Sequence, residues 1–250
     1  MDSKKIRLIY KWVFGLLSAF SIIFYYIYNL VDGQVIATDY FNSYETYTID
    51  YFTTFTLLSN VLVCVWFLVA AIDYKKEGQT KILSQTTANC VAVMITVTAL
   101  IWNFILVPLD DAFPSKPIPQ TANVINHIIS PIAYVVYVLV LMPNKININL
   151  NDFFLKKFWI HFTLVISYCI YAMVRGEMRY HSGPEYKGIL YPYFFLNIHG
   201  DGLIGIPGVG WFFIAFFLIL GIMIGFSYLY NWINNKVCKA KYYQKSFKTI

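Results

Sequence analysis

Three polar side chains occupy matched positions in long apolar segments of the chain. Thr56 and His127 each lie five residues after the start of such a segment, and Asn103 lies six residues before the end of another. A hydroxyl becomes a nucleophile when a neighbouring neutral imidazole takes its proton. Amide donors can stabilise the negative charge that develops on an attacked carbonyl oxygen. These residue types therefore indicate nucleophilic attack on an ester or a related acyl compound.

Further polar residues share the helical faces of Thr56 and His127, because residues three or four apart lie on one side of a helix. We predict Thr56 and His127 as the catalytic pair. The predicted substrate-binding or oxyanion residues are Ser59, Asn60, Asn103, Asn123 and Ser130. The nucleophile stays open among Thr53, Thr54, Thr56 and Ser59, since all four hydroxyls lie close together in YFTTFTLLSN.

Pro131 and three acidic residues bear on how His127 would be held. Proline has no N–H, so Pro131 should leave the carbonyl of His127 without its helical hydrogen bond. The apolar segments contain no Asp or Glu to orient the imidazole. Asp50, Asp110 and Asp111 lie at segment ends and could reach it. Otherwise the pair acts as a dyad, or a backbone carbonyl orients the ring.

The composition indicates the elements that carry these residues. Apolar residues make up 58% of the 250 residues and charged residues 13%, whereas a soluble domain has roughly 25% charged residues. This excludes a disordered or a disulfide-stapled secreted protein. A spanning helix needs about 20 mainly apolar residues. We predict an all-α, polytopic membrane protein, residues 1–250 forming a single bundle of six transmembrane helices, at about 8–30, 51–72, 89–109, 122–142, 158–174 and 209–231.

The cations predict the orientation of this bundle in the cell membrane. Of the 19 Lys and Arg residues, 15 fall in the two terminal segments and the second and fourth connections. Cytoplasmic segments carry the excess of Lys and Arg, so both termini should be cytoplasmic. The net charge of +6 is then accounted for without nucleic acid. Thr56, Asn103 and His127 should lie at one depth in the outer leaflet, beneath the aromatic segment Tyr191–Leu196.

No cofactor or metal is predicted. The sequence lacks a zinc spacing such as HExxH. His161 lies near the inner end of its segment, far in depth from His127, which argues against a haem held by both. The expected partners are membrane lipids and a lipid-ester substrate, without nucleic acid, and the sequence does not identify a protein partner.

Three motifs carry a family resemblance. FTLLSN, NHIISP and YPYFFLN resemble a family of bacterial six-span membrane proteins. That family is similar to the eukaryotic androgen-induced protein and androgen-dependent tissue-factor-pathway-inhibitor-regulating protein, which are intramembrane threonine hydrolases of fatty-acid esters of hydroxy fatty acids. The resemblance implies a role in lipid metabolism, with the nucleophile at Thr56 and the histidine at His127.

Three functions follow as hypotheses. The first is an intramembrane lipid-ester hydrolase with a Thr nucleophile and a His base. The alternative is a non-catalytic membrane protein that binds a lipid or small molecule in the same cavity. A transporter is third, because the apolar segments lack the carboxylate that ion-coupled transport commonly needs.

Overall fold

The computed structural model describes residues 3–183 and 186–247, with side chains as far as residue 239. The described residues are 77% helical and contain no strand. Within this part of the chain, six helices are long and apolar enough to cross a membrane. The first, second, fifth and sixth spans are α1 (Ser3–Asp32), α4 (Phe55–Ile72), α10 (Phe158–His181) and α11 (Gly208–Phe247). The third span consists of α5 (Gln85–Ile101), η1 (Trp102–Leu106) and α6 (Val107–Asp110). The fourth span consists of α7 (Pro117–Val124), η2 (Ile125–Ile129), α8 (Ser130–Val136) and η3 (Tyr137–Leu141).

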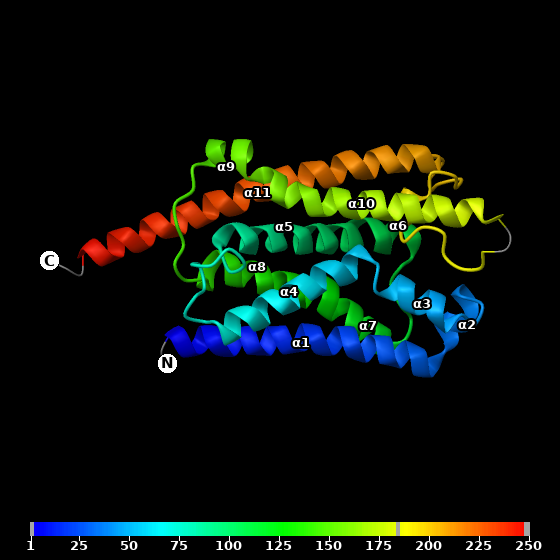
Figure 1. Ribbon diagram of the computed structural model, residues 1–250, viewed down its shortest axis with the longest axis horizontal. Helices are drawn as coiled ribbons and strands as arrows, with labels where there is room; N and C mark the ends of the chain where they lie inside the picture. Colours follow the sequence, from blue (N-terminus) through cyan, green and yellow to red (C-terminus); the bar gives the residue numbers. More distant parts are fainter. Residues whose placement is uncertain (1–2, 184–185, 248–250) are drawn as a thin grey trace.

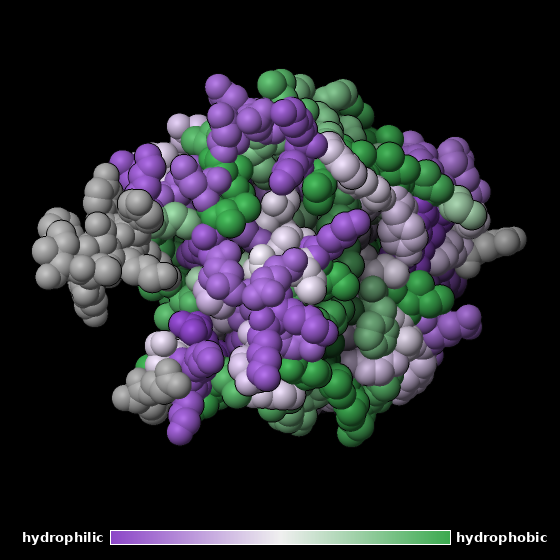
Figure 2. All heavy atoms as spheres, turned by 60° about the vertical axis from the view of Figure 1, so that its left-hand side comes forward, coloured by the Kyte–Doolittle hydropathy of each residue, from purple (hydrophilic) through white to green (hydrophobic). Residues whose placement is uncertain are grey.

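The six long helices run up and down, so α1 begins and α11 ends at the same end of the bundle, here called the terminal end (Figure 1). The short helix α9 (Leu150–Lys156) lies there too. The opposite end, the loop end, carries α2 (Gln34–Asp39), α3 (Tyr44–Tyr51) and the α10–α11 connection with η5 (Phe194–Leu196). Hydrophilic residues gather on the terminal end, and hydrophobic residues surround it (Figure 2).

The core lies between α4, α5 and the fourth span. Phe67, Met94 and Tyr134 are completely inaccessible there. By contrast, α10 and α11 are the least buried of the six long helices and expose large apolar side chains such as Ile170 and Phe217. Exposed apolar helix surface of this kind suits contact with lipid. The central helices therefore hold the buried polar groups, and α10 and α11 form an outer wall.

Several helix ends differ from those expected from hydropathy. The second span begins at Phe55 rather than residue 51, because the Thr54 side chain caps its first turn by accepting the N–H of Leu57. Residue 51 instead ends α3, in the connection between the first and second spans. The fifth span continues beyond Val174 to His181, because ion pairs accommodate its polar last turns.

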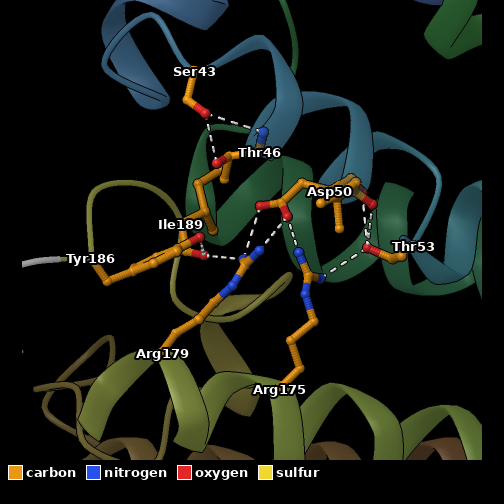
Figure 3. Close-up of polar contacts among 9 residues, drawn as sticks. Ser43, Thr46, Asp50, Thr53, Arg175, Arg179, Tyr186 and Ile189 are labelled. Atoms are coloured by element: carbon orange, nitrogen blue, oxygen red, sulfur yellow. Dashed lines mark hydrogen bonds and ion pairs between the residues drawn. The ribbon is translucent and has the colours of Figure 1, made fainter. Parts of the chain in front are cut away.

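One set of ion pairs, the arginine clamp, joins α3 to α10 (Figure 3). Arg175 and Arg179 both contact the Asp50 carboxylate, with Nη2 of Arg179 2.6 Å from Oδ1. Arg175 also donates to Oγ1 of Thr53 at 2.9 Å, and Arg179 donates to the Ile189 carbonyl at 2.7 Å. The clamp thus fixes the chain immediately before α4.

A second buried ion pair lies at the terminal end. Nζ of Lys11 is 2.7 Å from Oε2 of Glu77, and the two side chains are 2% and 1% exposed. Lys11 also donates to the Ala70 carbonyl at 2.5 Å, and Tyr137 donates to Oε1 of Glu77 at 2.6 Å. Both charges are therefore paired and hydrogen-bonded, which a buried ion pair requires.

Candidate functional site

A cavity of about 330 Å³ lies at the loop end and contains both predicted catalytic residues. Thr56 reaches it from the first turn of α4, and His127 reaches it from η2. Asn60, Asn123 and Asn126 also line it. Its other walls are Tyr25, Tyr51, Thr54, Leu57, Trp102, Leu106, Asp110, Ala112, Pro114, Pro192 and Tyr193. The structure thus brings Thr56 and His127 from separate spans to one cavity.

The His127 ring is held by two contacts. Its Nδ1 lies 3.0 Å from the carbonyl oxygen of Asn123, and its face stacks on Trp102 with centroids 4.0 Å apart and planes 12° apart. A carbonyl only accepts, so in the neutral ring Nδ1 carries the hydrogen and Nε2 keeps a lone pair. Nε2 is buried and has no hydrogen-bond partner in the protein. A backbone carbonyl therefore orients the imidazole, while Asp50 is occupied by the arginine clamp.

The helices around this ring widen into π-helical turns before prolines. Trp102 begins η1, which precedes Pro108, and His127 lies in η2, which precedes Pro131. Proline cannot complete the helical hydrogen bond, and π turns often occur at functional sites. The two stacked rings thus come from the two distorted turns.

Asn60 and Asn103 donate hydrogen bonds to two backbone carbonyls of the fourth span, those of Asn126 and His127, which lie about one turn before Pro131. Nδ2 of Asn103 donates to the carbonyls of Ala99 and His127, at 2.8 and 3.2 Å. Nδ2 of Asn60 donates to those of Thr56 and Asn126, at 2.9 and 3.1 Å. The His127 carbonyl that Pro131 was expected to leave free therefore accepts a hydrogen bond from Asn103.

This arrangement changes the roles expected for the predicted binding residues. Both amide hydrogens of Asn60 and of Asn103 are already donated, so neither side chain offers a hydrogen to an oxyanion. Asn123 donates one to the Pro119 carbonyl and faces the cavity. The sequence could not reveal this, because Asn60 and Asn103 each donate one of their two amide hydrogens to a carbonyl of another span.

Ser59 and Ser130 do not line the cavity. The Ser59 hydroxyl lies 2.7 Å from Oγ1 of Thr98, and the Ser130 hydroxyl lies 3.0 Å from that of Ser18. Both pairs are buried between neighbouring helices, where hydroxyl contacts of this kind join transmembrane helices. Ser59 and Ser130 thus join neighbouring helices and lie outside the lining of the cavity that Thr56 and His127 share.

Among the alternative nucleophiles, Thr56 has a hydroxyl that lines the cavity and whose side-chain partner is the Tyr193 phenol. Thr53 donates to the Ile49 carbonyl and accepts from Arg175, Thr54 caps α4, and the Ser59 hydroxyl is buried. Thr54 and Thr56 both line the cavity. The geometry therefore favours Thr56.

Trp102 is a site residue that the sequence did not single out, and Tyr193 was expected only as part of the aromatic segment Tyr191–Leu196. Tyr193, just before η5, accepts the Thr56 N–H at 3.3 Å, and burial raises its pKa, so the phenol keeps its proton. An aromatic residue in an apolar run is usually a packing residue, which hid Trp102. The aromatic segment Tyr191–Leu196 was expected to cover the site, and Pro192 and Tyr193 do wall the cavity.

The described residues contain no group of three His, Cys, Asp or Glu side chains that could hold a metal ion. The polar side chains at the site are instead Thr, His, Asn and Tyr groups and the single carboxyl of Asp110, which suit proton transfer and hydrogen bonding. No family model, curated protein or solved structure matches the chain, and the family resemblance stays a prediction.

Proposed function

We propose that the protein is an intramembrane lipid-ester hydrolase in which Thr56 is the nucleophile and His127 the base. The observation that carries this proposal is the shared cavity, which Thr56 and His127 line together from different spans. His127 presents an unpartnered Nε2 whose tautomer is fixed by the Asn123 carbonyl. That nitrogen can accept a proton.

The chemistry needs two steps. The Thr56 hydroxyl attacks the ester carbonyl carbon and passes its proton to Nε2 of His127, which returns it to the leaving alkoxide. Water, deprotonated by His127, then attacks the acyl carbon, and His127 returns that proton to the Thr56 oxygen as the bond to the acyl group breaks. The uncommitted amide hydrogen of Asn123 and the protonated Tyr193 hydroxyl are the candidate donors to the developing oxyanion.

The orientation of the bundle supports a bilayer substrate. We place the terminal end in the cytoplasm, because its connections hold Lys75, Lys76, Lys81, Lys145, Lys156 and Lys157. The cavity then lies in the outer half of the cell membrane. An ester group just beneath the lipid headgroups would meet Thr56 there, whereas a large water-soluble substrate would not.

The test is hydrolysis of long-chain lipid esters by the purified protein in detergent or lipid. Thr56→Val keeps the side-chain shape and removes the hydroxyl, so it should abolish turnover, whereas Thr56→Ser should retain it. His127→Ala should also abolish turnover. The double variant should be little worse than either single variant, because the pair acts as one unit. Parental turnover in Thr56→Val would refute the mechanism.

A non-catalytic lipid-binding protein is the second candidate. It is favoured by the commitment of Asn60 and Asn103 to backbone carbonyls, which leaves few donors for an oxyanion. A threonine-reactive lipid probe separates the two functions. Covalent labelling at Thr56 with release of the leaving group supports the hydrolase, and reversible binding alone supports the second candidate.

A further inference from the structure

An apolar cavity adjoins the candidate site. It has a volume of about 70 Å³ and shares Thr56, Trp102, Leu106 and Tyr193 with the larger cavity. Val97 and Ile101 of α5 and Val165 and Cys169 of α10 are among its other walls. The Thr98 hydroxyl on this wall is bonded to Ser59. Apart from this hydroxyl and those of Thr56, Tyr168 and Tyr193, the remaining walls are apolar, and the space beside them suits hydrocarbon better than water.

A second apolar cavity continues in the same direction. It has a volume of about 50 Å³ and shares Val165, Cys169, Phe195, Leu196 and Ile219 with the first. Its remaining walls are Phe162 and Ile166 of α10 and Phe212, Ala215, Phe216, Leu220 and Met223 of α11. The three cavities thus form a series from the Thr–His pair to the space between the two outermost helices.

We infer that the two apolar cavities are the subsite for the acyl chain of the substrate, entered sideways from the bilayer between α10 and α11. The inference rests on the proposed function, because it takes the substrate to be an ester. It adds that the acyl chain of this ester lies in the two apolar cavities. An ester group at Thr56 would place one of its chains among Trp102, Cys169 and Ile219. The larger cavity, which His127 lines, would receive the alcohol part of the ester.

The outer wall fits lateral entry. Phe162, Phe212 and Phe216 are half-buried, so their rings face the cavity and also reach the surface. From Phe162 to Cys169 the wall follows α10 over about 10 Å, at 1.5 Å per residue. These cavities are narrow as they stand, so a chain would enter by displacing these rings rather than by filling an open tunnel.

The first test is photo-crosslinking of a long-chain fatty acid to the Thr56→Val variant, which needs no turnover. A diazirine near the methyl end of the acid should label the second cavity, around Cys169 and Phe216. A diazirine near the carboxyl end should label around Trp102 and Tyr193. Mapping the labelled peptides by mass spectrometry gives the result. Label only on exposed residues of α10 and α11, regardless of diazirine position, would overturn the inference.

The second test changes the length of the subsite. Ile219 lines both apolar cavities, and Ile219→Trp should reduce capture of long-chain relative to short-chain acids roughly tenfold, the effect of excluding about two methylene groups. Ile224 lies on the same helix but is 44% exposed. Ile224→Trp is thus the matched control and should leave this ratio unchanged.

The two proposals fail separately. Position-dependent crosslinking in a protein that hydrolyses no ester would support the acyl subsite and refute the hydrolase. If the protein hydrolyses esters but Ile219→Trp leaves both the chain-length preference and the crosslinking pattern unchanged, the subsite is refuted and the Thr–His mechanism stands.

Discussion

Individual side chains in this bundle combine polar chemistry with complete burial, and Lys11 is the extreme case. Its ammonium is neutralised by Glu77, which is itself bonded to Tyr137. Removing one partner of a buried pair leaves an uncompensated charge and costs roughly 3–5 kcal/mol. We expect Glu77→Gln to lower the free energy of unfolding by about this amount. Reversible unfolding of the purified protein in mixed micelles measures it.

The exposed pair Lys156–Asp152 provides the control. Its side chains are 70% and 57% exposed, and such pairs contribute about 0–1 kcal/mol. Asp152→Asn should therefore leave the unfolding midpoint nearly unchanged. Equal losses for Glu77→Gln and Asp152→Asn would show that burial of the first pair has no energetic consequence.

The sequence allowed part of the site to be predicted at this scale. Thr56 and His127 could be found because polar residues in apolar spans are rare and their depths match. The supporting role of Asn60 and Asn103 could not be found, because it depends on which helices are neighbours. Trp102 was missed because an aromatic side chain in an apolar run carries no separate signal, and Tyr193 was expected only as part of the aromatic segment that covers the site.

The fourth span shows how elements compensate one another. Pro131 removes a backbone donor, and Asn103 from the third span donates to the His127 carbonyl in its place, while Asn60 of α4 donates to the adjacent Asn126 carbonyl. We expect Asn103→Leu to lower the free energy of unfolding by about 1–2 kcal/mol, the loss typical of an interhelical hydrogen bond in a membrane protein. In a Pro131→Ala background, a backbone N–H is restored and the same substitution should cost less.

A double-mutant cycle in mixed micelles measures this coupling. The single variants Asn103→Leu and Pro131→Ala are compared with the double variant and the parent. Strictly additive losses would mean that Asn103 does not compensate for Pro131, and the explanation given for its position would be wrong.

The arginine clamp acts between elements at the loop end. Asp50→Asn removes the charge that Arg175 and Arg179 share. We expect faster amide hydrogen exchange in α3 and in the last two turns of α10, because these segments lose their common contact. Exchange in α5 should stay unchanged, since the core contacts of that helix lie elsewhere. Uniform acceleration along the chain would instead indicate global destabilisation.

Element positions were largely predictable, and element ends were not. Six apolar runs predicted the six long helices. Their ends depend on side-chain caps and ion pairs, such as Thr54 at α4 and Asp50 opposite α10, which hydropathy does not detect. The helices α2 and α3 were missed because a connection rich in Tyr, Thr and Asp has no apolar periodicity.

At the scale of the whole molecule, an even number of spans brings both ends of the described chain to the terminal end (Figure 1). We predict that this end faces the cytoplasm. A cysteine engineered near residue 245, in a background without native cysteines, should be protected from an impermeant thiol reagent in intact cells. A cysteine at Lys187, in the α10–α11 connection, should react. The reverse pattern would contradict the orientation and would place the candidate site in the inner leaflet.

The Lys11–Glu77 contact also has a consequence for biogenesis. Translation delivers Lys11 to the membrane 66 residues before its carboxylate partner, since Glu77 follows α4. Until then, the lysine must keep its ammonium at the aqueous boundary by extending its stem. Tyr137 completes the contact only after the fourth span has been made. The first four spans should therefore assemble into a unit during synthesis, and α10 and α11, which close the proposed acyl subsite, should dock onto it last.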